Sequence, residues 1–243
     1  MVFRFSTLVF GLLANVAVFA APIYPDSNYL FGGSEGDGPS GQSLVLRLAD
    51  GSAYTASTHR APIGSESYAE NFGWWSDRLG HIPGNYNYLA GYNGVFDSVF
   101  RNFFSFDLSG LDGVVTSATL VLRPYSASFP FAPMRFNVFD VSTSPFDLLS
   151  GSAVAPDIFD DLGSGKLYGS HVFDADPSIS NAVAIRLWSS AVSDINARQG
   201  QYFSVGGTVG RIPEPSIIAL VLPALGLALS LSRRSKRDPS RLA

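Results

Sequence analysis

The sequence predicts a mainly β fold for the central part of the chain, an antiparallel β-sandwich of jelly-roll-like form. Short segments that alternate apolar and polar residues recur there between turns rich in Gly, Pro and Asn. Only one segment has the periodicity of a helix. Aromatic residues make up 13% of the chain and include 19 phenylalanines, which suits a core between two sheets.

The first half of this central part contains few regular segments. Residues 22–42 are rich in Gly, Pro, Ser and Asp and are predicted to form a flexible leader. Residues 43–48 alternate and predict a first strand, which is followed by a turn at Asp50-Gly51. Residues 61–94 carry Gly, Asn or Pro every few positions, so we expect mostly long loop there, with at most one short strand.

Regular strands are expected from residue 103 onward. Phe104, Phe106 and Leu108 share one face of the first, and Ser105 and Asp107 share the other. The remaining strand candidates are residues 114–123, 135–141, 169–174 and 181–187, and a last strand that begins at Tyr202.

One short helix is predicted near residues 188–198. Trp188, Ala191, Val192 and Ile195 fall on one side of it, and Gly200 is a typical residue after a helix C-terminus. The predicted globular domain therefore spans residues 43–211.

The N-terminal residues 1–21 have the features of a secretory signal peptide. Arg4 is the single early cation, residues 8–19 are apolar, and the small residues Val18 and Ala20 precede the expected cleavage position. The apolar stretch is too short to favour a membrane anchor.

The C-terminal segment combines three features in a fixed order. Pro213, Glu214 and Pro215 come first, and the uncharged apolar residues 216–232 follow. A basic cluster at residues 233–237 then supplies Arg233, Arg234, Lys236 and Arg237. Seventeen helical residues reach roughly 25 Å, the lower limit for crossing a hydrocarbon core, and the basic cluster should stay cytoplasmic. A buried core helix is the alternative interpretation.

This segment, residues 212–237, resembles the PEP-CTERM sorting signal of exported bacterial proteins. The resemblance implies transient membrane anchoring on the outer side of the inner membrane and processing near the Pro-Glu-Pro motif by an exosortase. Release to the cell surface or to the extracellular matrix of a biofilm would follow. This sequence differs by Pro223 within the apolar run and by residues 238–243, a tail after the basic cluster.

A second resemblance covers less of the chain. Residues 104–111 and 115–120 look like the hairpin of DNRLRE-type extracellular β-sandwich domains, and residues 193–200 with 203–207 resemble the closing helix and strand of many PEP-CTERM proteins. Both resemblances imply a β-sandwich and carry no catalytic residues.

Composition excludes several classes of function. Six of the 16 basic residues and two of the 20 acidic residues lie in the terminal segments, so residues 21–211, the leader and the domain together, carry a formal charge of about −8, against −4 for the chain. An acidic domain without a basic cluster disfavours nucleic acid as a partner. The absence of cysteine excludes disulfides, thiol catalysis and iron–sulfur chemistry.

No catalytic motif stands out, and we do not expect an enzyme. The chain has three histidines, His59, His81 and His171, but no Gly-x-Ser-x-Gly sequence that would mark a serine nucleophile. Two carboxylates can hydrolyse a glycoside, yet Glu35, Glu66 and Glu70 lie in loop-like sequence without the features of a cleft. A glycoside-active enzyme is therefore the less favoured alternative.

Calcium is the one cofactor that the sequence leaves open. Asp157, Asp160 and Asp161 are oxygen ligands in turn-forming sequence, as are Asp174 and Asp176, although neither group has the EF-hand spacing. The alternative interpretation is that these aspartates only form turns and keep the surface soluble.

An aromatic loop, residues 72–96, is the candidate binding site. Flat rings beside amide side chains can stack on sugars and hydrogen-bond their hydroxyl groups, so the loop predicts recognition of an exopolysaccharide. The alternative is that the rings cap the core. The residues concerned are Trp74, Trp75, Tyr86, Tyr88 and Tyr92, interleaved with Asn85, Asn87 and Asn93.

Taken together, the sequence predicts an exported bacterial protein of the cell surface or extracellular matrix, with a structural or adhesive role and no enzymatic activity. The alternative is a carbohydrate-binding module that uses the aromatic loop.

Overall fold

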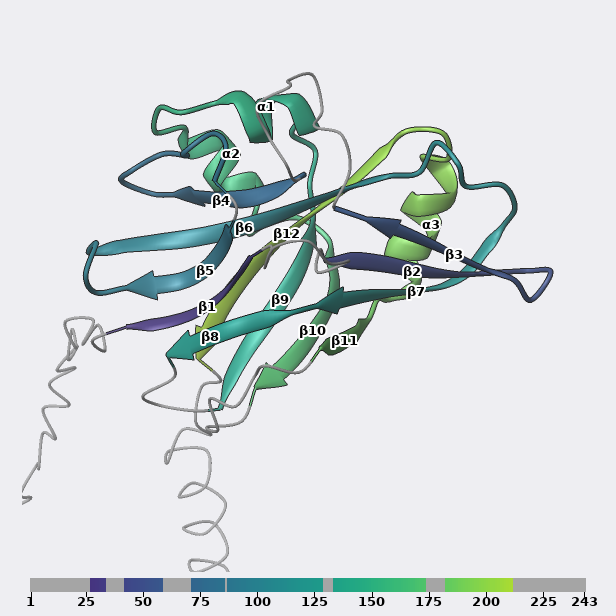
Figure 1. Ribbon diagram of the computed structural model, residues 1–243, viewed down its shortest axis with the longest axis horizontal. Coiled ribbons are helices and arrows are strands. Elements are labelled where there is room, and N and C mark those ends of the chain that lie inside the picture. Colours follow the sequence, from purple (N-terminus) through teal and green to yellow (C-terminus); the bar gives the residue numbers. More distant parts are fainter. Residues whose placement is uncertain are drawn as a thin grey trace, which may run out of the picture.

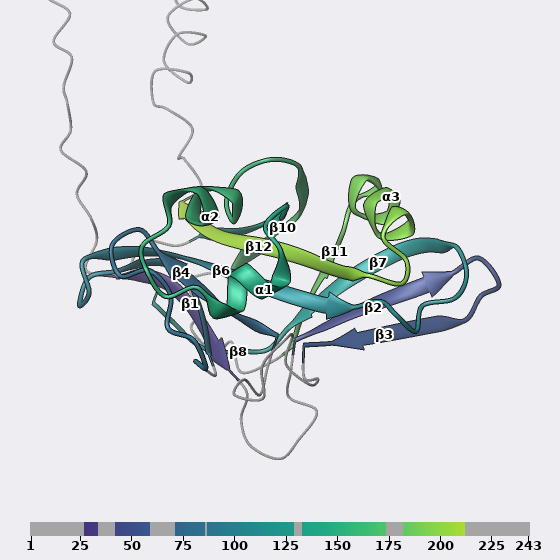
Figure 2. The same cartoon turned by 90° about the horizontal axis from the view of Figure 1, so that it is seen from above.

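The computed structural model of the chain describes residues 27–33, 42–58, 71–85, 87–128, 133–173 and 182–211. Two antiparallel sheets form two layers (Figures 1 and 2). Strands hold 52% of these residues and helices 14%, which confirms the mainly β prediction.

The larger sheet has eight strands. Its order is β10-β9-β12-β6-β5-β1-β8, and β4 pairs with β6 outside this path. The strands are β1 (Asn28–Gly33), β4 (Phe72–Ser76), β5 (Asn87–Asn93), β6 (Ser98–Asp107), β8 (Pro124–Ser128), β9 (Met134–Asp140), β10 (Leu167–Phe173) and β12 (Tyr202–Arg211).

The smaller sheet has four strands in the order β11-β7-β2-β3, all antiparallel. They are β2 (Ser43–Leu48), β3 (Ala53–Ser57), β7 (Val115–Leu122) and β11 (Val183–Arg186). Each strand predicted from alternation is a strand of one of the two sheets, and β2 has the predicted bounds.

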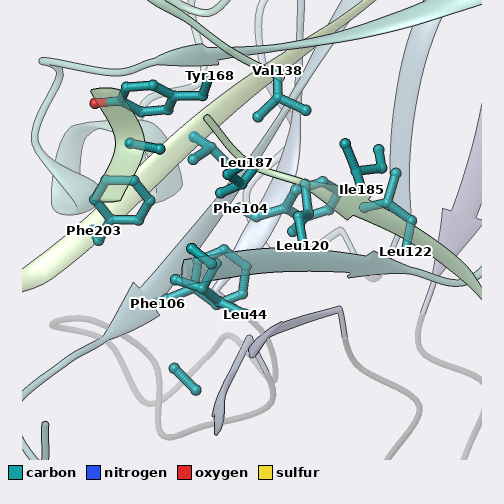
Figure 3. Close-up of a cluster of buried hydrophobic side chains, with 14 of the residues drawn as sticks. Leu44, Phe104, Phe106, Leu120, Leu122, Val138, Tyr168, Ile185, Leu187 and Phe203 are labelled. Atoms are coloured by element: carbon teal, nitrogen blue, oxygen red, sulfur yellow. The ribbon is translucent and has the colours of Figure 1, made fainter. Parts of the chain in front are cut away.

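The main core lies between the two sheets because each sheet turns one set of alternate residues inward. Leu44 and Leu120 come from the smaller sheet, and Phe104, Phe106 and Phe203 come from the larger (Figure 3). All five side chains are fully buried.

Helix α3 (Ser189–Ala197) confirms the predicted helix near residues 188–198. It buries Ala191 and Ile195 in the main core, while Trp188, which precedes its first turn, is 48% exposed. The periodicity had placed Trp188 on the apolar side of the helix, but its ring is not part of the main core.

Two further short helices, α1 (Pro145–Ser150) and α2 (Pro156–Asp161), were not expected. They lie over β4 in Figure 1. Leu148 and Leu149 of α1 pack with Trp75 and Phe103 in a second apolar cluster. The single-helix prediction is wrong because helices of six residues are too short to show apolar periodicity.

Three strands occupy segments that were expected to be irregular. β1 falls within the predicted flexible leader and pairs with β5 and β8, and β4 and β5 fall within the predicted long loop. All five residues of β4 are buried, so both of its faces are covered and its sequence does not alternate. β1 contains Gly32 and β5 contains Gly91, and at both positions close neighbours fill the space that a side chain would need. Because glycine is not typical of a strand, neither segment was predicted as one.

Within the described residues, no helix is long and apolar enough to cross a membrane. The predicted signal peptide, the sorting segment at residues 212–237 and the tail at 238–243 all lie outside the described residues.

Candidate functional site

The strongest candidate site is an apolar groove of about 480 Å³ beside β4 and β5. It is formed by β1, β4, β5 and β6 together with the turns that follow β4 and β5 (Figure 1). Four rings line it, those of Phe31, Trp74, Phe96 and Phe100.

The rings form a continuous wall. Phe100 meets Trp74 edge to face with ring centroids 5.0 Å apart, and it meets Phe96 at 6.1 Å. Phe96, Leu79 and Ile82 stand at the rim and remain 54%, 48% and 56% exposed. An exposed apolar rim above a buried aromatic floor is typical of a surface that binds a partner.

Asn85 and Asn87 bring amide groups into this apolar surface. The side-chain oxygen of Asn87 accepts a hydrogen bond from the indole nitrogen of Trp74 at 2.9 Å. This bond fixes the amide beside the ring, so the groove offers polar groups next to an aromatic edge.

The turn between β5 and β6 positions Phe96. Asp97 adopts a φ of 45°, which is uncommon for a residue other than glycine. Its carboxylate accepts a hydrogen bond from Tyr92 at 3.0 Å and pairs with Arg78, and these two contacts keep the pKa of Asp97 below its ordinary value. The turn is therefore held from two sides.

His81 connects the groove to α1. Its ring stacks on Trp75 with centroids 5.2 Å apart. Nδ1 lies 2.7 Å from the backbone oxygen of Trp74, and Nε2 lies 3.3 Å from that of Leu149. Burial lowers the pKa of His81, and the two carbonyl oxygens oppose this only in part. The enclosed imidazole links the backbone of β4 to that of α1.

The structure places most rings of the predicted aromatic site inside the domain. Trp75 and Tyr88 are 1% and 0% exposed, and Trp74 is 6% exposed, so none of the three presents a free ring face. The β4 and β5 strands carry these rings inward, as the core alternative had it. Tyr92 is half-buried and hydrogen-bonded to Asp97, and Tyr86 lies outside the described residues.

The three predicted calcium ligands serve different contacts. Asp161 accepts hydrogen bonds from the backbone and hydroxyl groups of Ser142 and Thr143 at 2.7–3.0 Å. Asp160 lies 3.4 Å from Arg101, and Asp157 is exposed on α2. The described part of the chain contains no group of three acidic or histidine side chains that could hold a metal ion.

The other predicted site residues fall outside the described residues. These are the candidate calcium ligands Asp174 and Asp176 and the sorting residues Pro213, Glu214, Pro215, Arg233, Arg234, Lys236 and Arg237.

The predicted aromatic loop includes the segments that border the groove, but the residues at the groove rim were not predicted. Phe96 follows Val95 in a turn flanked by Asn93, Gly94 and Asp97, where polar residues are the norm. Two adjacent large apolar residues at a turn were the signal that could have identified the rim.

Comparison with known proteins gives no further assignment, because no protein-family model and no curated protein matches the chain.

Proposed function

We propose that the chain is an exported, non-enzymatic bacterial protein with a structural or adhesive role at the cell surface or in the extracellular matrix. The main support for export is the sequence of the C-terminal segment. Pro213-Glu214-Pro215 comes first, the apolar residues 216–232 follow, and the basic cluster 233–237 comes last. A predicted signal peptide at residues 1–21 supports the same route. Processing by an exosortase-type enzyme would release the domain from the inner membrane.

The adhesive role is supported by the groove. Leu79, Ile82 and Phe96 leave apolar surface exposed around a concave site, and a partner that covers them would remove this surface from water.

We infer a jelly-roll-like arrangement, supported by the way the chain changes sheets: β6, β8 and β12 belong to the larger sheet, and β7 and β11, which lie between them in sequence, belong to the smaller.

Cell fractionation tests the export proposal. Deleting residues 233–237 should change the distribution of the protein among membrane, surface and medium, because the basic cluster sets the orientation of the apolar segment. A matched deletion of residues 238–243 should leave the distribution as it is. An unchanged distribution in the first variant would reject the sorting role.

A carbohydrate-binding module is the second candidate function. The contact between Asn87 and Trp74 favours it, because an amide beside a ring can hydrogen-bond a sugar whose apolar face lies on the groove wall. The residues assigned to binding are then Phe96, Asn85 and Asn87, in place of the buried Trp75 and Tyr88.

Binding of the purified protein to neutral exopolysaccharides tests this second candidate. Phe96→Ala should weaken binding by about 1–2 kcal/mol, the range for a loss of apolar contact area and ring packing. Val95→Ala is the matched control, because Val95 is 85% exposed in the same turn and does not line the groove. Equal effects of the two substitutions, or binding that neither affects, would remove the groove from the proposal.

A further inference from the structure

The outer face of the smaller sheet has a composition that differs from the rest of this acidic domain. Leu44, Leu46 and Leu120 point into the core, so the alternate residues of the same strands point outward. The strand registers place these outward residues side by side on one face. They are Ser43, Val45 and Arg47 of β2, Ala53, Thr55 and Ser57 of β3, Ser117, Thr119 and Val121 of β7, and Ala184 and Arg186 of β11.

Among the residues that the structure describes, this outer face carries cations and hydroxyl groups but no Asp or Glu. Arg47 is opposite Ser117, and Arg186 is opposite Thr119, on either side of β7. Arg123, the residue after β7, continues the same alternation, and all three arginines are exposed. Strand spacing puts the Cα atoms of Arg47 and Arg186 about 12 Å apart, with hydroxyl side chains between them.

The three arginines make no ion pair within the described part of the chain. Arg78, Arg101 and Lys166, by contrast, pair with Asp97, Asp160 and Asp194. Guanidinium groups without ion pairs, on a face whose described residues include no carboxylate, give a local positive potential, although residues 21–211 together carry a formal charge of about −8.

A depression of about 400 Å³ adjoins this face where β11 ends. It is lined by Thr116, Ser117, Arg186, Trp188 and Ser189, and the ring of Trp188 is 48% exposed. A sugar ring can stack on the indole while hydroxyl groups and a guanidinium surround its polar edge.

We propose that this outer face, with Trp188 at its edge, binds an acidic polysaccharide. Guanidinium groups bind carboxylates in a bidentate geometry, and the serine and threonine hydroxyls can bond the sugar hydroxyls between successive acidic groups. Because Arg47 lies on β2, Arg186 on β11 and Arg123 just after β7, a polymer that carries repeated carboxylates engages several of them, whereas a single sugar acid engages one.

The choice of a polysaccharide over a nucleic acid rests on two points. Three separated arginines are few for binding a backbone that carries a charge at every nucleotide, and the surrounding domain is acidic. A polysaccharide partner also rests on the proposed export of the chain, whereas the binding itself can be measured in solution. The site shares no residue with the groove beside β4.

Fluorescence anisotropy of a labelled oligogalacturonate with the purified full-length protein in mild detergent tests the proposal. We expect saturable binding that weakens as salt is added, and little binding of the methyl-esterified oligosaccharide, which has the same backbone without charge. Arg47→Gln with Arg186→Gln should raise the Kd about tenfold or more, and Trp188→Ala should raise it several-fold. Free galacturonate should compete poorly.

Matched variants separate this site from general effects of charge and of exposed apolar surface. Arg135→Gln removes an exposed arginine from the larger sheet, and Val95→Ala removes exposed apolar surface from the turn between β5 and β6, so neither should change the Kd. Trp188→Phe keeps an aromatic ring and should retain most of the affinity, and circular dichroism checks that each variant is folded. Equal binding of the esterified sugar, an equal effect of Arg135→Gln, or tighter binding of single-stranded DNA would overturn the proposal. None of these results depends on where the protein resides in the cell.

Discussion

Asn102 lies in the middle of β6, where it points into the core without a hydrogen-bond partner among the described residues. The side chain is 0% exposed, and neither its amide nitrogen nor its oxygen is bonded there. Burying an amide without partners costs free energy, because the bonds to water that it loses are not replaced. Its oxygen occupies the space that a side chain at position 207 would need, so Gly207 makes room for the buried amide.

Asn102→Val should therefore stabilise the protein by about 1 kcal/mol, since it removes the unsatisfied amide and places a β-branched residue in a strand. Urea denaturation measures the free energy of unfolding. Ser105→Ala on the same strand is the contrasting variant, because Ser105 is also buried but lies 2.7 Å from the hydroxyl of Ser204. It should destabilise by about 1 kcal/mol. A loss of stability in Asn102→Val would show that a water or another group bonds the amide.

His81 makes stability depend on pH. Its pKa lies below the ordinary 6.5 in the folded state because burial disfavours the imidazolium. In the unfolded chain the imidazole takes up a proton as the pH falls through about 6.5, whereas in the folded chain it resists protonation. The His81 contribution to stability is thus fully present above pH 6.5 and is lost as the pH falls toward the folded-state pKa.

Unfolding curves at pH 7.5 and pH 5 measure this effect. The parent protein should lose more stability between the two pH values than His81→Gln, which keeps an amide in place of the ring but cannot titrate. Equal losses in the two proteins would mean that folding does not change the pKa of His81, and a smaller loss in the parent would mean that the fold raises it.

At the scale of the elements, Asp161 joins α2 to the loop before α1. Burial alone raises the pKa of Asp161, but the hydrogen bonds from Thr143 and Ser142 outweigh it and lower the pKa. Asp161→Ala should destabilise the protein by about 2 kcal/mol, the range for hydrogen bonds to a charged group. Thermal unfolding with and without calcium measures this and also tests the calcium hypothesis. If calcium stabilises the parent and not the variant, Asp161 is a calcium ligand after all.

Several of the elements that sequence patterns predicted have one buried face and one exposed face. β2 and β7 alternate because the core covers only one side of them, and α3 is long enough to show its apolar side. β4 was missed because α1 covers its second face, an effect of tertiary packing that no local pattern contains. α1 did leave a signal: Ser144 caps it, Pro145 begins it and Asp147 bonds back to Ser144.

The candidate site was predictable as a segment but not as a set of residues. Composition drew attention to the aromatic residues of the 72–96 loop, yet the direction in which each ring points depends on strand pairing. Trp74 and Trp75 are adjacent and point to opposite sides of β4, so one reaches the groove and the other reaches α1.

At the scale of the whole molecule, β1 closes the larger sheet between β5 and β8. Leu30 of β1 is fully buried in the main core. A chain that begins after residue 33 should lose at least about 3 kcal/mol of stability, the cost of removing a large buried side chain and its packing. A chain that begins at Ser27 keeps every described residue and should unfold as the longer chain does. Urea denaturation of the two truncated chains compares them, and equal stability would show that β1 is dispensable.

The position of β12 has a consequence for the order in which the molecule can form. β12 is the last described strand, ending at Arg211, yet it lies inside the larger sheet, where it pairs with both β6 and β9. A ribosome or a translocation channel delivers the chain from its N-terminus, so the strands on the two sides of β12 emerge before the one that joins them. Until then the edges of β6 and β9 that pair with β12 stay unpaired. The larger sheet can therefore be completed only after residue 211 has emerged.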